Sequence, residues 1–233
     1  MIAGGNGKPA STHAALMDRV YRNQRHIYDL SRKYYLLGRD RLIRELRAQP
    51  HERAIEIGCG TARNLIAIAK TYPGVALYGI DASSEMLRTA GESVGRAGLQ
   101  SRIVLKQGLA EMLSPQLFAL KGNFDHAIFS YSLSMIPDWR GALAAAAASV
   151  RQGGSIHVVD FGDLKKLWGP ASRGLRAWLR LFHVAPRDEL LTALEGAKGR
   201  PDCSLHILPG RYAFVFRASP SAIGEILDAG TKT

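Results

Sequence analysis

The sequence predicts an α/β protein with a doubly wound, mostly parallel sheet of seven strands, and with helices before the first strand. Short apolar runs alternate with longer segments of helical periodicity, as in sheets whose strands are joined by helices. A glycine-rich turn follows the first of these runs, at the place where such folds bind ligands. At 233 residues the chain is long enough for one such domain with a buried core.

Two helices are expected ahead of the sheet. Apolar side chains at spacings of three and four predict a helix over residues 13–37, and Gly38 is a natural end to it. A second helix is predicted over residues 39–48. We therefore expect residues 1–48 to form an N-terminal helical lid or extension, and residues 49–233 to form the domain that contains the sheet.

The remaining elements alternate along the chain. The predicted strands are 53–58, 76–81, 102–108, 124–132, 155–161, 204–210 and 212–218. The predicted helices are 61–71, 83–96, 139–150 and a helical stretch over 167–196. We expect the last two strands to form an antiparallel pair at the edge of the sheet.

The composition is strongly basic. Lys and Arg number 31 against 20 Asp and Glu, which gives a net charge of +11 and a pI of about 9.9. Nucleic acid, a membrane surface or an acidic substrate fits such an excess. The two cysteines, Cys59 and Cys203, provide no disulfide framework, which favours a reducing cytoplasm. We expect no signal peptide, no membrane-spanning segment and no metal site.

The glycine turn lies within the stretch AIEIGCGTARNL, residues 54–65. Gly58 and Gly60 are present, but Arg63 stands where a dinucleotide-binding turn has its third glycine. The phosphate-binding P-loop pattern is absent as well. The pattern that fits is E-x-G-x-G-x-[G/A], which begins at Glu56.

Two closely spaced glycines let the backbone approach a ligand that has no pyrophosphate, such as the amino-acid part and ribose of S-adenosylmethionine. The next predicted strand ends at Asp81, roughly 20 residues after Gly60, the distance at which an acid binds two ribose hydroxyls. A simple tight turn, with Asp81 as a helix cap, is the structural alternative. The agreement of these features favours a cofactor site.

These residues resemble those of the class I S-adenosylmethionine-dependent methyltransferases, over roughly residues 50–165. The resemblance implies a Rossmann-like methyltransferase fold, with S-adenosylmethionine as cofactor and S-adenosylhomocysteine as product. It implies that Gly58 and Gly60 line the methionine part and that Asp81 holds the ribose. The residues that it places at the cofactor are Glu56, Gly58, Gly60, Asp81, Ala82, Met86, Leu109, Ala110 and Ser130.

The adenine end departs from the common pattern of that family. Ala82 or Met86 is expected on one face of the adenine, and the loop 109–111 on the other. Leu109 occupies the position at which many members carry an acid for the adenine amino group. Ala62 replaces the usual last glycine of the loop. A backbone carbonyl or a water molecule would then accept from the adenine amine.

The segment after the fourth predicted strand bears on the substrate. Its sequence, SYSLSMIPDW (130–139), lacks the N/D-P-P-Y turn typical of enzymes that methylate nucleobase or amide nitrogens. The signatures of RNA-binding modules are also absent. We therefore expect no nucleic-acid partner, despite the basic charge.

Two basic stretches, residues 17–46 and 172–184, combine arginines with aromatic and aliphatic side chains, as helices on anionic membranes do. We expect the second to lie over the substrate entrance. Arg173, Arg176 and Arg180 would then meet membrane phosphates, and Trp178 would line the entrance. The alternative is that the apolar faces cover the sheet and the arginines are merely solvated.

With these stretches included, residues 21–217 resemble the bacterial N-methyltransferases that make betaine lipids. The segments that carry this resemblance are YRNQRHIYDLSRKYYLLGRDRLI, EIGCGTARNL, SYSLSMIPDW and HVVDFGD. The resemblance implies three successive methylations of diacylglyceryl-homoserine to the trimethylated lipid. It also implies a cytoplasmic protein on the inner face of the bacterial cell membrane.

An amine acceptor needs orienting groups more than a strong base. Asp160 and Asp163 follow or end the fifth predicted strand on the ligand side, and Tyr35 and Tyr131 offer hydroxyls or aromatic walls. These four are the predicted substrate-positioning residues. Three alternatives stay open: a phospholipid N-methyltransferase acting on phosphatidylethanolamine, a quinone-type C-methyltransferase, and a non-catalytic module that binds the cofactor.

Overall fold

A computed structural model describes residues 36–166, 168–181 and 186–229, with the side chains of residues 170, 171, 178, 180 and 181 outside that description. The predicted helix over 13–37 and Tyr35 therefore lie outside the described residues, except for the last two positions of that helix. The division into residues 1–48 and 49–233 stays a prediction.

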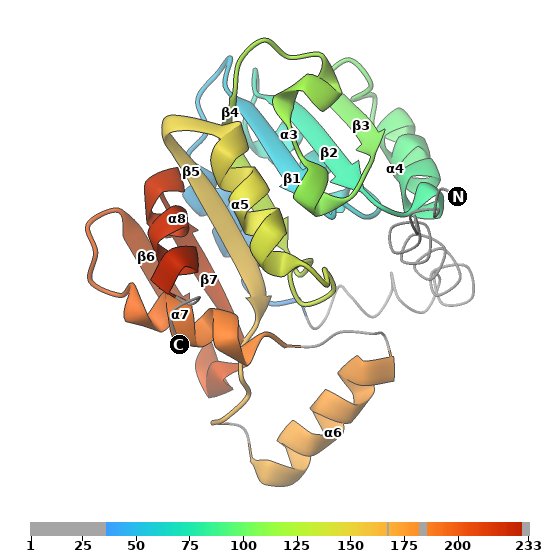
Figure 1. Ribbon diagram of the computed structural model, residues 1–233. Helices are drawn as coiled ribbons and strands as arrows, with labels where there is room; N and C mark the ends of the chain where they lie inside the picture. Colours follow the sequence, from blue (N-terminus) through green and yellow to red (C-terminus); the bar gives the residue numbers. More distant parts are fainter. Residues whose placement is uncertain (1–35, 167, 182–185, 230–233) are drawn as a thin grey trace, which may run out of the picture.

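One sheet of seven strands runs through the described chain in the order β3-β2-β1-β4-β5-β7-β6 (Figure 1). The strands are β1 (Arg53–Ile57), β2 (Ala76–Asp81), β3 (Ile103–Gln107), β4 (Phe124–Ser130), β5 (Val150–Phe161), β6 (Cys203–Ile207) and β7 (Ala213–Ala218). The first five are parallel, and β7 runs antiparallel to both β5 and β6. The predicted doubly wound sheet and its antiparallel edge pair are confirmed.

Helices cover both faces of the sheet. They are α2 (Arg39–Leu46), α3 (Arg63–Thr71), α4 (Ser84–Arg96), α5 (Trp139–Ser149), α6 (Gly169–Leu181), α7 (Asp188–Gly196) and α8 (Pro220–Ala229). Buried side chains of α2, α3 and α4 share one core cluster, and those of α5, α7 and α8 share the other. No described helix is both long and apolar enough to cross a membrane.

The structure differs from the prediction mainly after β4. The strand β5 begins at Val150 rather than residue 155, and its pairing with β4 shifts register between Phe124 and His126. The helical stretch predicted over 167–196 is divided into α6 and α7. The helix α8 was not predicted. Figure 1 shows α6 standing away from the sheet, beyond the carboxyl ends of the strands.

A buried polar chain lies at the opposite, amino edge of the sheet. His126 on β4 contacts the Glu52 carboxylate through Nε2 at 2.9 Å and the Ser155 hydroxyl through Nδ1 at 2.9 Å. The same hydroxyl lies 2.8 Å from Nε2 of His157 on β5. Burial, together with the charges of His126 and Arg217, lowers the pKa of His157 to about 3, so the ring is neutral at pH 7.

Candidate functional site

The glycine loop connects β1 to α3 at the carboxyl edge of the sheet. Gly58 and Gly60 both have positive φ angles, 70° and 52°, which glycine adopts without steric cost. A Cβ atom on Gly58 would lie 2.6 Å from Cβ of Ser132, so this position has room for glycine alone. Ala62 also has a positive φ, 60°, at the residue before α3 begins. These conformations leave the backbone of the glycine loop uncovered by side chains at the carboxyl edge of the sheet.

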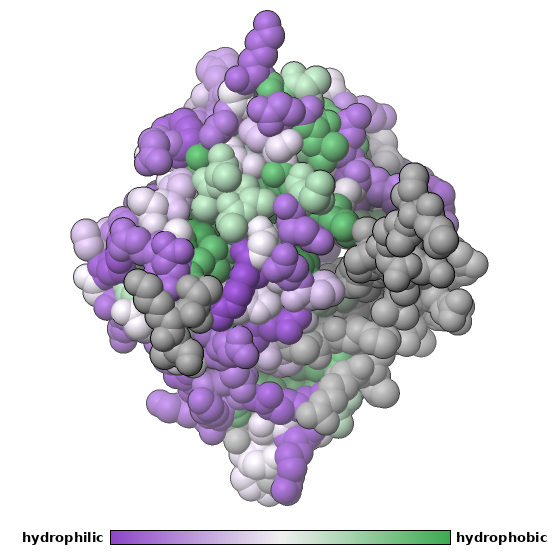
Figure 2. Space-filling model, in the orientation of Figure 1, coloured by the Kyte–Doolittle hydropathy of each residue, from purple (hydrophilic) through white to green (hydrophobic). Residues whose placement is uncertain are grey.

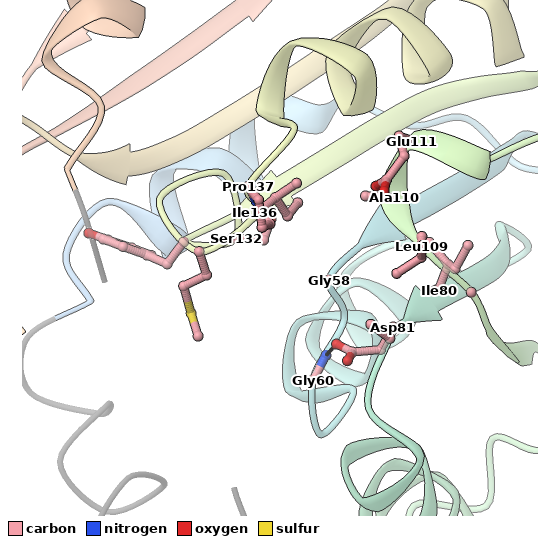
Figure 3. A pocket seen from close by; sticks show the side chains of 14 residues that line it. Gly58, Gly60, Ile80, Asp81, Leu109, Ala110, Glu111, Ser132, Ile136 and Pro137 are labelled. Carbon is pink, nitrogen blue, oxygen red and sulfur yellow. Dashed lines mark hydrogen bonds between the residues drawn. The ribbon is translucent and has the colours of Figure 1, made fainter. Parts of the chain in front are cut away.

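Asp81 fixes this loop from the end of β2. One carboxylate oxygen accepts a hydrogen bond from the Gly60 amide at 2.8 Å, and the other accepts from the Ser83 amide at 2.9 Å. Figure 3 shows the Asp81 side chain directed at Gly60. Carboxylate oxygens can accept more than one hydrogen bond, so these contacts leave Asp81 able to bind ribose hydroxyls.

A pocket opens beside this loop. It lies between the carboxyl ends of β1 and β2 on one side and the segment after β4 on the other (Figure 3). The residues that line it are Gly58, Gly60, Ile80, Asp81, Ala82, Gly108, Leu109, Ala110, Glu111, Tyr131, Ser132, Met135, Ile136 and Pro137. Asp81 and Gly60 face Ile136 and Pro137 across it, which places a polar wall opposite an apolar one.

A second, smaller pocket shares Gly58 with the first and is lined by polar side chains. Arg39 donates from Nε to the Asn64 side-chain oxygen at 2.9 Å, and the Asn64 amide donates to the Glu56 carboxylate at 2.6 Å. Ser130 also lines this pocket, and its buried hydroxyl has no hydrogen-bond partner among the described residues. Cations, a carboxylate and an unused hydroxyl fit the charged amino-acid end of a ligand.

The two pockets together fit S-adenosylmethionine. The first would hold ribose and adenine beside Asp81, and the second the methionine ammonium and carboxylate, with the close approach at Gly58 between them. Eight of the nine predicted cofactor residues line one of the two pockets. Met86 does not: it is buried in α4, where its backbone amide donates to the Ser83 hydroxyl as part of a helix cap.

Several lining residues were not singled out from the sequence. Glu111 supplies a carboxylate two residues after Leu109, in the same loop that was expected to contact the adenine. Arg39 and Asn64 belong to helices on either side of the second pocket. The acid at 111 was visible in the sequence, whereas Arg39 gave no signal because it is one of many arginines near the N-terminus.

Asp160 lines neither of these two pockets, and its predicted contact with a substrate amine stays a prediction. Its side chain is buried, with oxygens that accept from the Ser134 amide at 3.0 Å and the Phe161 amide at 2.7 Å. Burial raises its pKa to about 6, although these hydrogen bonds oppose that shift. Asp160 therefore supports the segment that forms the apolar wall of the pocket.

Asp163 is likewise used inside the protein, in a cluster that we call the Arg211 clasp: Asp163, Glu195 and Arg211. Two hydrogen bonds of 2.7 and 2.8 Å join Asp163 to Arg211, which also reaches Glu195 on α7 at 2.8 Å. Burial opposes ionisation of Asp163, but the interactions with Arg211 and Lys165 together outweigh it and lower the pKa of Asp163. The prediction that Asp163 orients the amine is therefore not supported.

The clasp requires glycine at position 162. A Cβ on Gly162 would lie 2.1 Å from the Arg211 carbonyl oxygen. The Gly162 amide donates to the Tyr212 carbonyl at 2.9 Å, and the Leu164 amide donates to the Arg211 carbonyl at 3.1 Å. The exit of the chain from β5 is thus fixed against the segment before β7.

Tyr131 is the one predicted substrate residue that lines the main pocket. Its φ is 56°, its ring contacts Phe161 with centroids 4.7 Å apart, and its hydroxyl donates to the Leu37 carbonyl. The side chain therefore joins the pocket wall to the start of the described chain. Tyr35, the remaining predicted residue, lies outside the described residues.

The arginines predicted to face a membrane differ in their contacts. Arg176 donates to the Asp163 carbonyl and lies 3.4 Å from the Asp188 carboxylate, so its charge is used within the protein. Arg173 is exposed. The side chains of Arg180 and Trp178 lie outside the described part of the chain. No group of three His, Cys, Asp or Glu side chains that could hold a metal ion occurs among the described residues.

Methyltransferases are among the known proteins to which this chain is similar. Residues 55–156 match the family model described as a methyltransferase domain. The demethylmenaquinone methyltransferase of Geobacillus stearothermophilus is 26% identical over 142 residues, which are 58% of each chain. This chain thus spans just over half the length of that relative.

A further relative and a solved structure match over a larger share of the chain. The ubiquinone/menaquinone biosynthesis C-methyltransferase of Syntrophotalea carbinolica is 29% identical over 216 residues, covering 89% of this chain and 84% of the relative. A SAM-dependent methyltransferase from Aquifex aeolicus has the same fold, with a TM-score of 0.58 and 16% identity over 90% of this chain and 97% of that one. Residues 55–156 thus match a methyltransferase domain, and the described chain has the Rossmann-like fold of S-adenosylmethionine-dependent methyltransferases, with its glycine loop held by Asp81.

Proposed function

We propose that this chain transfers methyl groups from S-adenosylmethionine to the amine of diacylglyceryl-homoserine, giving the trimethylated betaine lipid. The observation that carries the proposal is the apolar wall of the main pocket, formed by Met135, Ile136 and Pro137 opposite Asp81. The apolar part of a lipid can lie along such a wall without burying unpaired polar groups. The resemblance over residues 21–217 supports the amine as the accepting group.

Methyl transfer to an amine does not require a strong general base from the protein. S-adenosylmethionine, when bound, supplies an electrophilic methyl group on its sulfonium. An α-amino group has an ordinary pKa of about 7.7–8.0, so a large fraction is neutral and nucleophilic near pH 8. Holding the amine in line with the methyl group then supplies much of the rate.

The residues of the pocket have corresponding tasks. Gly58 and Asp81 would hold the methionine and ribose parts, and Glu111, which lines the same pocket, would accept from the adenine amine. The ring of Tyr131 is an aromatic wall against which the growing methylammonium charge can lie. Asp160 keeps the segment after β4 in place through its hydrogen bond with Ser134.

A quinone-type C-methyltransferase is the second candidate, because the relatives above are named for that reaction. Its acceptor is also apolar, so the apolar wall suits both. The reactions differ in their proton requirement: a carbon acceptor on a phenolic ring becomes nucleophilic when its hydroxyl is deprotonated. A neutral amine attacks without a base, and each methylammonium product releases one proton to solvent before the next methylation. Phosphatidylethanolamine is a further amine acceptor that the same pocket would suit.

One assay separates these functions. The protein is incubated with S-adenosylmethionine labelled in its methyl group and, separately, with diacylglyceryl-homoserine, phosphatidylethanolamine or a demethylated quinol in detergent. Label in mono-, di- and trimethylated homoserine lipid is the expected result. Label in the quinol alone would replace this proposal with the second candidate. Cofactor binding without label in any lipid would favour a non-catalytic module.

A further inference from the structure

The segment between β5 and α7 has an unusual charge. Residues 164–187 contain six Lys or Arg and no Asp or Glu. Two of these arginines are used within the protein: Arg176 by Asp163 and Asp188, and Arg187 by the Ile136 carbonyl at 2.9 Å. Lys165 is exposed but lies 3.4 Å from Asp163. Lys166 and Arg173 are exposed and have no described partner, so their charge faces solvent.

An exposed tryptophan lies between these two cations in the chain. The side chain of Trp168 is 78% exposed, the largest exposed fraction among the large hydrophobic side chains of the described residues. By contrast, Leu179 on α6, the helix that follows Trp168, is buried in the core, and Leu175 is partly buried against it. Leu175 and Leu179 therefore form the face of α6 that packs against the core, and Trp168 is not part of that face.

The start of α6 projects from the molecule, so that it could contact an extended surface such as a membrane. The start of α6 forms the lower tip of the molecule in Figure 1, on the side where the carboxyl ends of the strands lie. In Figure 2, hydrophilic residues and residues of intermediate hydropathy lie side by side at the lower end of the molecule, where α6 lies. The far end of the segment adjoins the main pocket, because Arg187 holds the carbonyl of Ile136.

We propose that Lys166, Trp168 and Arg173 form a docking surface for anionic phospholipid membranes, which we call the α6 tip. The charge is complementary to lipid phosphates, and a tryptophan beside lysine and arginine is the combination that favours the membrane–water interface. The inference rests on the proposed function for its purpose, since docking at the α6 tip brings the pocket to a lipid-borne acceptor.

Membrane suits this surface better than nucleic acid. Single-stranded nucleic acid binds in grooves that combine several aromatic side chains with a track of cations. The α6 tip instead projects, with one aromatic ring between two cations. A projecting ring can enter the interface while the cations remain at the phosphates.

Co-sedimentation with vesicles tests the proposal. The full chain and the double variant Lys166→Gln/Arg173→Gln are mixed with vesicles of phosphatidylcholine alone or with one quarter phosphatidylglycerol. The full chain should bind the anionic vesicles and dissociate as salt rises. The double variant should bind them roughly 30-fold more weakly, which corresponds to about 1 kcal/mol per cation. Trp168→Ala should weaken binding on the order of tenfold, through lost apolar contact.

A matched control is Lys121→Gln/Lys198→Gln, which removes the same charge from exposed positions that precede β4 and β6. It should bind anionic vesicles as the full chain does. Equal weakening in both double variants would overturn the α6 tip in favour of general charge attraction. Tight binding to an RNA homopolymer that depends on Lys166 and Arg173, without vesicle binding, would overturn it in favour of nucleic acid.

The docking and the reaction can fail separately. Affinity for S-adenosylmethionine, measured by calorimetry, should be the same in the full chain and in Lys166→Gln/Arg173→Gln, because neither residue lines the main pocket or the second pocket. Vesicle binding that depends on the α6 tip, with no methylation of any lipid amine, would contradict the proposed function and leave the docking surface standing. Methylation of dispersed lipid without vesicle binding would contradict the docking surface alone.

Discussion

Asp81 combines two roles within one side chain. Its oxygens accept from the Gly60 and Ser83 amides, and the same carboxylate is predicted to bind the ribose. We expect Asp81→Ala to weaken S-adenosylmethionine binding by about 1.5–3 kcal/mol, because a charge-assisted pair of hydrogen bonds is lost. Titration calorimetry measures this. Asp228→Ala, which removes an exposed carboxylate from α8, is the control, and unchanged affinity in a folded Asp81→Ala would remove Asp81 from the site.

Gly58 is limited by contact as well as by conformation. An alanine there would place Cβ 2.6 Å from Ser132 Cβ at a φ of 70°. We expect Gly58→Ala to cost about 1–3 kcal/mol of unfolding free energy and to displace the loop from the cofactor. Gly91→Ala is the matched control, because a Cβ there meets nothing within 4 Å and α4 should gain about 0.5–1 kcal/mol. Thermal unfolding of both variants decides the point.

At the scale of elements, the buried chain at the amino edge joins β4 and β5 and makes stability depend on pH. Unfolded histidine takes up a proton below its ordinary pKa of 6.5, whereas native His157 stays neutral down to about 3. The unfolded state therefore binds more protons in this window, and stability falls as pH falls, by up to about 1.4 kcal/mol per pH unit. Urea unfolding at pH 7, 6, 5 and 4 should show a shallower fall in His157→Gln; identical slopes would contradict this account.

Asp160 contributes with the opposite sign. Its native pKa of about 6 lies above the ordinary value of 3.8, so the native state retains a proton that the unfolded state has lost between these values. Stability from this group falls as pH rises from about 3.8 to 6. We expect Asp160→Asn to remove that fall, which the same urea series would measure. A pH profile identical to that of the unchanged protein would contradict the raised pKa.

The Arg211 clasp connects three elements, because Arg211 joins Asp163 after β5 to Glu195 on α7 and Arg176 on α6 reaches the Asp163 carbonyl. Lysine cannot make these paired contacts with two carboxylates. We expect Arg211→Lys to loosen the base of α6 and to speed chymotrypsin cleavage at exposed Trp168 several-fold. Lys198→Gln, at an exposed position before β6, should leave the cleavage rate unchanged. Equal rates in Arg211→Lys and the unchanged protein would show that the clasp does not hold α6.

For the whole molecule, the strands of the sheet could be predicted from the sequence. Alternating apolar runs located all seven strands, and β2 was located with both ends correct, because buried parallel strands are continuous apolar segments. The boundary between α6 and α7 was missed although Pro186 signals it. Proline and the residue before it disfavour a continuous helix. The start of β5 at Val150 was missed because glycines at 153 and 154 suggest a turn.

The parts of the candidate site that depend on the spacing of residues along the chain could be predicted from the sequence. The parts that depend on the direction of a side chain could not. Gly58, Gly60 and Asp81 follow from the loop pattern and the strand end. Asp160 and Asp163 were placed at the correct edge, but a sequence does not show that backbone amides and Arg211 would take up their carboxylates. Met86 lies outside both pockets for the same reason, since the turn of α4 directs it into the core.

Gly162 has a consequence for mutational scanning. Every other amino acid brings a Cβ into collision with the Arg211 carbonyl oxygen at 2.1 Å, so a library covering all substitutions should find almost none tolerated there. Such intolerance is commonly read as a sign of catalysis. Position 162 lines neither pocket, so its intolerance would report the geometry of a chain crossing. A screen that scores protein abundance beside methyl transfer would separate the two, because changes at Gly162 should lower both together.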